Sequence, residues 1–197
     1  MTKISVDDLM YGYCNGIFPM ADSQEGEIYW YSPDPRAVIP IDSYKPFKSL
    51  RPTLNQKVFE VAFNKNFEEV MKNCALPRFH GDETWISQDI IDSYNNLHKL
   101  GFAHSVEVYK QDILVGGLYG VSVGSAFFGE SMFHKVPNAS KVAFHYLLEN
   151  LKLRNFKLLD TQFINDNVKR FGAIEIPKRQ FMKILKESIS TKNKFID

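Results

Sequence analysis

Three polar side chains stand inside segments of this chain that are otherwise apolar. Glu130 lies in the run Phe-Phe-Gly-Glu-Ser-Met-Phe at residues 127–133, and Asp160 and Gln162 follow a pair of leucines at 158–159. Burying a carboxylate or an amide without a partner costs free energy, so these groups must be satisfied by one another or by a ligand. Because carboxylates can exchange a proton or hold positive charge, the two segments are candidates for a site.

The spacing predicts which of these groups share a face. Side chains two apart on a strand point the same way, so Glu130 would lie beside Phe128 and Met132. By the same rule, Asp160 would lie beside Gln162. If the two segments are neighbouring strands, a carboxylate pair and an amide converge in a largely apolar cleft. A buried hydrogen-bond network that only specifies the fold is the alternative, and the spacing leaves both open.

Other chemistries find less support in the sequence. The five histidines are His80, His98, His104, His134 and His145. They never fall at HxxxH or HExxH spacing, so we predict no metal site. No serine stands in a GxSxG motif at a strand-to-helix turn, because the Gly-Val-Ser-Val-Gly at 120–124 lies within strand-like sequence. The glycines at 116–120 lie in strand-like sequence without a following Lys-Ser pair, so bulges or close backbone approach explain them better than a phosphate loop.

The elements that position these groups are predicted from the period of the apolar residues. Helical spacing begins after Ser5, a predicted N-cap, and Asn15-Gly16 ends that helix. Two prolines in Trp-Tyr-Ser-Pro-Asp-Pro-Arg at 30–36 predict a turn that redirects the chain. Helical spacing returns at 67–74, and again at 90–98 between a Ser87 cap and Gly101.

Beyond residue 101 the period changes to two. Residues 113–123 and 125–133 predict successive antiparallel strands. The remaining predicted elements are a helix at 142–151, a strand at 157–163, a short helix at 166–171 and a last helix at about 178–190. This order predicts an α+β domain with a mixed or antiparallel sheet flanked by helices. We divide the chain into a small N-terminal domain at 1–40 and a catalytic domain at 41–197.

Composition limits the class of protein. The chain has 197 residues, of which 44% are hydrophobic and 14% aromatic, enough for a substantial core. A net charge of +1 gives no global attraction to nucleic acid, although residues 135–179 hold nine basic and four acidic side chains. That excess is either a local basic face or a solvated helical surface. Two isolated cysteines, Cys14 and Cys74, indicate a reducing compartment. With neither a leader nor a long apolar run, we predict a cytoplasmic protein that contacts no membrane.

Short motifs in order along the chain resemble the leucyl/phenylalanyl-tRNA–protein transferase family. They are Gly-Ile-Phe-Pro-Met at 16–20, Trp-Tyr-Ser-Pro-Asp-Pro-Arg at 30–36, Thr-Trp-Ile at 84–86, Ala-His-Ser-Val-Glu at 103–107, Leu-Val-Gly-Gly-Leu-Tyr-Gly at 114–120, Phe-Gly-Glu-Ser-Met-Phe at 128–133, Asn-Ala-Ser-Lys at 138–141, Asp-Thr-Gln at 160–162 and Phe-Gly-Ala at 171–173. Each motif alone is weak, but their number and order make the resemblance specific.

The resemblance implies an activity and a fold. Family members transfer leucine or phenylalanine from aminoacyl-tRNA to the α-amino group of a protein that begins with Lys or Arg, which marks that protein for degradation. The implied fold is a GNAT-like acyltransferase domain joined to a small N-terminal domain. Because the aminoacyl ester is already activated, no cofactor is expected, and no DNA partner is implied.

The resemblance also implies roles for particular residues. In the family pattern, the positions that match Glu130, Asp160 and Gln162 hold the acceptor and assist peptide-bond formation. The position that matches Trp85 lies against the terminal adenosine of the tRNA. The positions that line the pocket for a Leu, Phe or Met donor side chain match Leu118, Phe127, Met132, Phe144, Leu147 and Leu159. By themselves, these six apolar residues would be interpreted as ordinary core.

Strand alternation conflicts with a single pocket. Phe127 falls opposite Met132, and Leu159 falls opposite Asp160, so a pocket that uses all of them requires a bulge, a splayed strand or a wrap-around shape. For the chemistry, we expect Gln162 to aim the amine. We expect Asp160 to orient the Gln162 amide, and Glu130 to attract the cationic Lys or Arg terminus.

The sequence departs from the family pattern in places, and two alternative functions are open, one suggested by the fold class and one by the N-terminal departure. Family members usually begin with further residues, so the N-terminal domain is predicted to be shortened, and Met20 stands where some members carry Trp. A CoA-dependent N-acyltransferase is one alternative, although residues 133–141 contain no glycine for a pyrophosphate loop. A tRNA-binding or degron-binding module without activity is the other.

Overall fold

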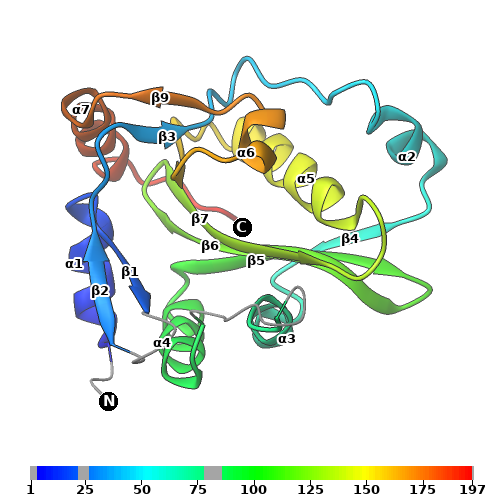
Figure 1. Cartoon of the computed structure of the whole chain (residues 1–197), viewed down its shortest axis with the longest axis horizontal. Helices are drawn as coiled ribbons and strands as arrows, with labels where there is room; N and C mark the ends of the chain where they lie inside the picture. The colour runs from blue at the N-terminus through cyan, green and yellow to red at the C-terminus, as the bar shows by residue number, and fades with distance from the viewer. Residues whose placement is uncertain (1–3, 22–26, 78–85, 197) are drawn as a thin grey trace.

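The computed structural model describes residues 4–21, 27–77 and 86–196. Its main feature is a seven-stranded sheet with the strand order β4-β5-β6-β7-β8-β3-β9 (Figure 1). The bounds are β3 Arg36–Val38, β4 Glu60–Phe63, β5 Ala103–Lys110, β6 Ile113–Val123, β7 Ala126–His134, β8 Leu158–Gln162 and β9 Ile174–Ile176. All neighbours are antiparallel except β7 and β8, which are parallel. The predicted mixed α+β architecture is confirmed.

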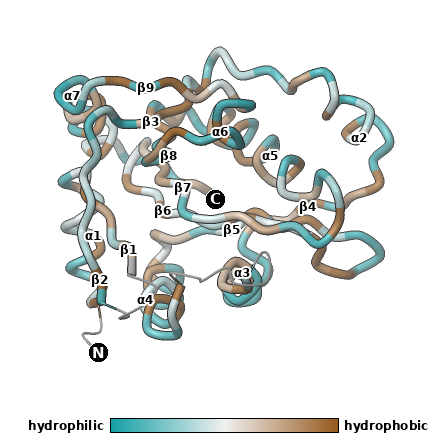
Figure 2. Tube along the Cα trace, viewed as in Figure 1, coloured by the Kyte–Doolittle hydropathy of each residue, from teal (hydrophilic) through white to brown (hydrophobic). Residues whose placement is uncertain are grey.

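Helices cover both faces of this sheet (Figure 1). They are α1 Val6–Cys14, α2 Arg51–Gln56, α3 Phe67–Cys74, α4 Gln88–Lys99, α5 Ala139–Leu153, α6 Asp166–Arg170 and α7 Lys178–Ile189. One hydrophobic core joins the sheet to α1, α3, α4 and α7, and a second lies between the sheet and α5. Figure 2 shows α4 with both colours, as expected for a helix that covers a core with one side only.

Local sequence signals account for the helix ends. Ser5 forms the predicted capping box at the start of α1 with Asp8. The Ser87 hydroxyl accepts the backbone N–H of Ile90 at the start of α4, and Gly101 follows its end with φ +82°. A Cβ added at Gly116 would come within 2.5 Å of the Ala139 Cβ, so glycine there lets α5 begin directly against β6. Close backbone approach therefore explains this glycine, as predicted.

The first forty residues contribute to two sheets. A hairpin of β1 Phe18–Ala21 and β2 Ile28–Tyr31 stands apart from the large sheet, whereas β3 inserts between β8 and β9. The sequence analysis did not predict β1, β2, β3, β4, β9 or α2. These strands have three or four residues and α2 has six, too few for a period to show. The domain boundary at residue 40 stays a prediction.

One extra residue interrupts the pairing of β6 with β7. Tyr119 lies opposite Ser131 and Gly120 lies opposite Gly129, which leaves Glu130 as an inserted residue, a β-bulge. On the other side of β7, the ladder with β8 is recorded only as far as the pair Phe128 and Asp160. The bulge and the end of this ladder coincide, so the two strands part where the polar side chains begin.

Candidate functional site

A cavity of about 200 Å³ lies beyond the last paired residues of β7 and β8. Its polar wall includes Glu130, Ser131, Thr161, Gln162 and Asn165, and its apolar wall includes Met20, Leu118, Met132, Phe144 and Leu147. Strands β7 and β8 supply most of the polar wall, and β1, β6, β7 and α5 supply the apolar wall. Such a cavity can hold an apolar group next to a reacting polar one.

Glu130 lies at the centre of the polar wall. Its Oε1 accepts a hydrogen bond from the Tyr13 hydroxyl at 2.7 Å and another from Gln162 Nε2 at 3.0 Å. Burial raises the pKa of Glu130 to about 7, although the two hydrogen bonds and Arg36 oppose that rise. A carboxyl group with this pKa can gain or lose a proton near neutral pH, as a general acid–base catalyst must.

Gln162 is held at both its backbone and its side chain. Its φ of +65° is unusual for a residue with a Cβ, and its backbone N–H donates to Asp160 Oδ1 at 2.9 Å. Its side-chain N–H donates to Glu130, as described above. With Nε2 turned to the carboxylate, the amide oxygen is left as an acceptor for an N–H group in the cavity.

Asp160 is fully buried and faces away from the cavity toward β3. Arg36 binds it through two hydrogen bonds, Nε to Oδ1 at 2.9 Å and Nη2 to Oδ2 at 2.6 Å. The guanidinium lies 4.7 Å from the ring centre of Phe18 and 4.6 Å from that of Phe181. This sandwich makes the ion pair a rigid support, and the carboxylate orients the Gln162 backbone rather than its side-chain amide.

The structure brings the predicted trio together through hydrogen bonds, from Gln162 to Glu130 and from Gln162 to Asp160. Four of the six predicted pocket residues line the cavity, namely Leu118, Met132, Phe144 and Leu147. Phe127 and Leu159 do not line it and are buried in the apolar core beneath. The bulge at Glu130 resolves the conflict for Phe127 and Met132, because one inserted residue returns Met132 to the face of Phe127. It thereby takes Met132 off the face of Phe128, contrary to the prediction, and Leu159 remains opposite Asp160.

Three residues behind the site were missed by sequence reasoning. Tyr13 and Tyr94 fit the apolar stripes of their helices, and nothing in those stripes indicated that their hydroxyls meet each other below Glu130. Arg36 did carry a signal, since a charge directly before Ala37 requires a buried partner if the strand is buried. Trp85, the predicted adenosine contact, lies outside the described residues.

Comparisons with known proteins were made over the whole chain. The family model described as leucyl/phenylalanyl-tRNA protein transferase matches residues 38–186, and the model of its N-terminal domain matches residues 2–34. A leucyl/phenylalanyl-tRNA–protein transferase from Chlorobaculum tepidum is 47% identical over 193 residues, which cover 98% of this chain and 100% of the relative.

Solved structures show more distant likenesses. L-PGS from Bacillus licheniformis is 9% identical with a TM-score of 0.49, covering 81% of this chain and 66% of that chain. A ribosomal-protein-alanine N-acetyltransferase from Brucella melitensis is 12% identical with a TM-score of 0.40, covering 57% of this chain and 86% of that chain. Neither TM-score reaches 0.5, and the assignment rests on the sequence matches.

Proposed function

This chain belongs to the leucyl/phenylalanyl-tRNA–protein transferase family, which transfers leucine or phenylalanine from aminoacyl-tRNA to protein N-termini, and we propose that the cavity between β7 and β8 is where it does so. In this proposal, the donor side chain occupies the apolar wall. The α-amine of the acceptor enters from the polar wall, and the two meet at the aminoacyl ester.

Magnitudes indicate what the protein must supply. The ester is activated already, and an α-amine with a pKa of roughly 8 is about 10% neutral at pH 7, so deprotonation costs only about 1.4 kcal/mol. Holding the amine and the ester in attack geometry is worth on the order of 7–11 kcal/mol. Positioning is therefore the larger contribution, and a rigid pair of acceptor groups suits it.

We assign the roles as follows. Glu130 attracts the ammonium form of the acceptor and takes its proton, because a carboxyl pKa of about 7 lies close to that of the amine. The Gln162 amide oxygen accepts the remaining N–H and aims the nitrogen at the ester carbon. Asp160 does not reach the amine. It is a positioning residue that fixes the Gln162 backbone while Arg36 neutralises it.

The acceptor and the donor are specified by opposite walls. A Lys or Arg terminus fits a site whose carboxylate has no bound cation among the described residues on the cavity side. On the donor side, Leu118, Met132 and Phe144 accept a side chain that is unbranched at Cβ, such as Leu, Phe or Met. Trp85 keeps its proposed contact with the terminal adenosine. We place the reaction in the cytoplasm, where charged tRNA is made and where the product would enter degradation.

The observation that carries this proposal is the 3.0 Å hydrogen bond from Gln162 Nε2 to Glu130 Oε1 at the edge of an apolar cavity. The test is to incubate leucyl-tRNA with a peptide that begins with Arg and to detect the added leucine by mass. Gln162→Ala should lower kcat/KM at least a hundredfold, whereas Gln180→Ala, exposed on α7, should not change it. Transfer by Gln162→Ala at the normal rate would contradict the assignment.

The two alternatives make different predictions in the same assay. A CoA-dependent acyltransferase would acetylate the peptide when given acetyl-CoA, and a binding module would retain leucyl-tRNA without product. The family match disfavours both, because it extends over residues 38–186 and includes Glu130, Asp160 and Gln162.

A further inference from the structure

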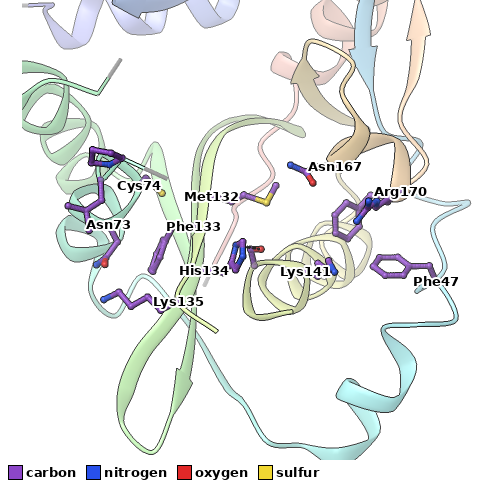
Figure 3. Close-up of a pocket in the computed structure, with 14 residues that line it drawn as sticks. Phe47, Asn73, Cys74, Met132, Phe133, His134, Lys135, Lys141, Asn167 and Arg170 are labelled. Carbon is purple, nitrogen blue, oxygen red and sulfur yellow. Dashed lines mark hydrogen bonds between the residues drawn. The ribbon is translucent and has the colours of Figure 1, made fainter. Parts of the chain in front are cut away.

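A second and larger cavity, of about 420 Å³, adjoins the first (Figure 3). Met132 and Asn167 line both cavities, so the two lie side by side at these residues. The second cavity extends from there between the end of β7, the end of α3, the first turn of α5 and α6. Its lining residues include Phe47, Cys74, Phe133, Ser140 and Phe171.

The charge of the second cavity is opposite to that of the first. His134, Lys135, Lys141 and Arg170 line it, and no Asp or Glu is among its described lining residues. Figure 3 shows His134, Lys141 and Arg170, from β7, α5 and α6, on one side of the β7 ribbon, with Lys135 on its other side near Asn73. Within the described part of the chain, none of the three Lys and Arg side chains forms an ion pair with a carboxylate.

The first turn of α5 adds to this positive potential. Asn138 is the N-cap, but its side chain accepts no hydrogen bond from the backbone N–H groups of the helix. Its Oδ1 instead accepts a hydrogen bond from the Lys141 side chain, Nζ, at 3.0 Å. Backbone N–H groups in the first turn of a helix have no intrahelical partner, and the helix dipole places partial positive charge there. Ser140 and Lys141, both in this turn, line the cavity. Anions are favoured at such a position.

We propose that this basic cavity binds a phosphodiester group near the 3′ end of the donor RNA, one nucleotide from the aminoacyl ester. This inference rests on the proposed function. If the aminoacyl group occupies the first cavity, the adjoining nucleotides must lie next to that cavity, and the cavity with these cations is its neighbour at Met132 and Asn167. Each nucleotide of that strand brings one negative charge, which matches a cavity that has positive groups and aromatic walls.

An acidic stretch of the acceptor protein is the rival occupant. The RNA is favoured because its charge is present in every donor, whereas the acceptor is recognised in the first cavity by its positive terminus. The two occupants differ in which substrate should respond to mutation, so one set of measurements separates them.

The experiment compares two short donors that differ by one phosphodiester. One is adenosine with leucine esterified to its ribose, and the other is cytidylyl-adenosine with the same leucyl ester. The wild-type enzyme should use the dinucleotide about tenfold better in kcat/KM, and this ratio should fall as salt rises. In the double variant Lys141→Gln/Arg170→Gln, the ratio should fall to nearly one.

A matched control removes the same number of positive charges from the same two helices, but outside the cavity. Lys152→Gln/Lys169→Gln removes one cation from α5 and one from α6, both exposed and neither in the cavity lining. This control should retain the tenfold ratio. Thermal unfolding of both double variants checks that they are folded before the ratios are compared.

Each outcome has a definite meaning. Equal use of the two donors by the wild-type enzyme would overturn the proposal, as would an unchanged ratio in Lys141→Gln/Arg170→Gln. If that variant instead changes the preference between Arg-Glu and Arg-Gln peptides with the adenosine donor, the cavity serves the acceptor and the proposal is wrong. If leucyl-tRNA itself gives no product with the wild-type enzyme, the proposed function has failed.

Discussion

Gln162 separates two carboxylates that lie in opposite surroundings. Behind it, Asp160 is paired with a guanidinium that two aromatic rings enclose. On the cavity side of Gln162, Glu130 accepts hydrogen bonds from the Tyr13 hydroxyl and the Gln162 amide, and no cation among the described residues binds it directly. The pKa of Glu130 rises to about 7. The comparison shows how one sheet can make one carboxylate structural and leave the other able to exchange a proton.

The largest effect should come from removing the reactive member of this pair. Glu130→Gln keeps the shape and the hydrogen-bond capacity but cannot take a proton, so kcat/KM for leucine transfer should fall by about 10²–10⁴. In the wild-type enzyme, kcat/KM should decline as the pH falls below about 7, because Glu130 becomes protonated. The dependence is measured with leucyl-tRNA and an Arg-peptide from pH 6 to 8. A wild-type profile that is flat across pH 7 would argue against a proton-accepting role.

The structural carboxylate, Asp160, and its partner Arg36 should affect stability. Arg36→Met leaves the buried Asp160 without its cation, so the free energy of unfolding should fall by about 3–5 kcal/mol in urea titrations. Arg179→Met, on the exposed start of α7, should change it by no more than about 0.5 kcal/mol. The double variant Arg36→Met/Asp160→Met should recover part of the stability. No recovery would mean that the charge is not the source of the loss.

The raised pKa of Glu130 predicts a pH dependence of stability. Its pKa rises from 4.5 to about 7 on folding, so between these values the folded state binds more protons than the unfolded state. Stability must therefore fall as the pH rises through this window, by about 3 kcal/mol in total. Glu130→Gln should lack this component. Urea unfolding of both proteins at pH 5 and pH 7.5 gives the difference, and parallel changes in the two would contradict the assignment.

The smallest effect concerns the phenol beneath Glu130. Tyr13→Phe removes a hydrogen bond that holds the pKa of Glu130 down, so the midpoint of the activity profile should move to higher pH. The free energy of unfolding should fall by about 1 kcal/mol. Tyr11→Phe, on the exposed side of the same helix, serves as the control. A midpoint that moves to lower pH would be inconsistent with donation from Tyr13 to the carboxylate.

The long elements could be predicted because their apolar residues repeat often enough to show a period. The strand β6 was predicted with the bounds 113–123 that the structure has, and α3, α5, α6 and α7 lie close to their predicted ranges. The strand β3 could not be predicted, because three residues after a proline show no alternation. Its partners are also distant in sequence, and only the tertiary structure supplies them.

The site, too, was predictable in part only. The polar residues inside apolar runs did converge. The spacing rule that placed Asp160 and Gln162 on one face was wrong, because Gln162 has φ +65° and lines the cavity, whereas Asp160 faces Arg36. The sequence could not reveal which side of Gln162 each carboxylate occupies, because that depends on Arg36 and on the bulge at Glu130. Tyr13 was hidden because an aromatic residue on a helix stripe is indistinguishable from core until its hydroxyl finds a partner.

The insertion of β3 between β8 and β9 has a consequence for the order of synthesis. Arg36 and Asp160 are 124 positions apart, so a ribosome releases the cation long before its carboxylate partner. Until β8 and β9 emerge from the ribosome, β3 has no neighbouring strand with which to form hydrogen bonds. Contacts between residues so distant in sequence slow folding. A nascent chain therefore cannot complete this sheet until β8 and β9 have been made.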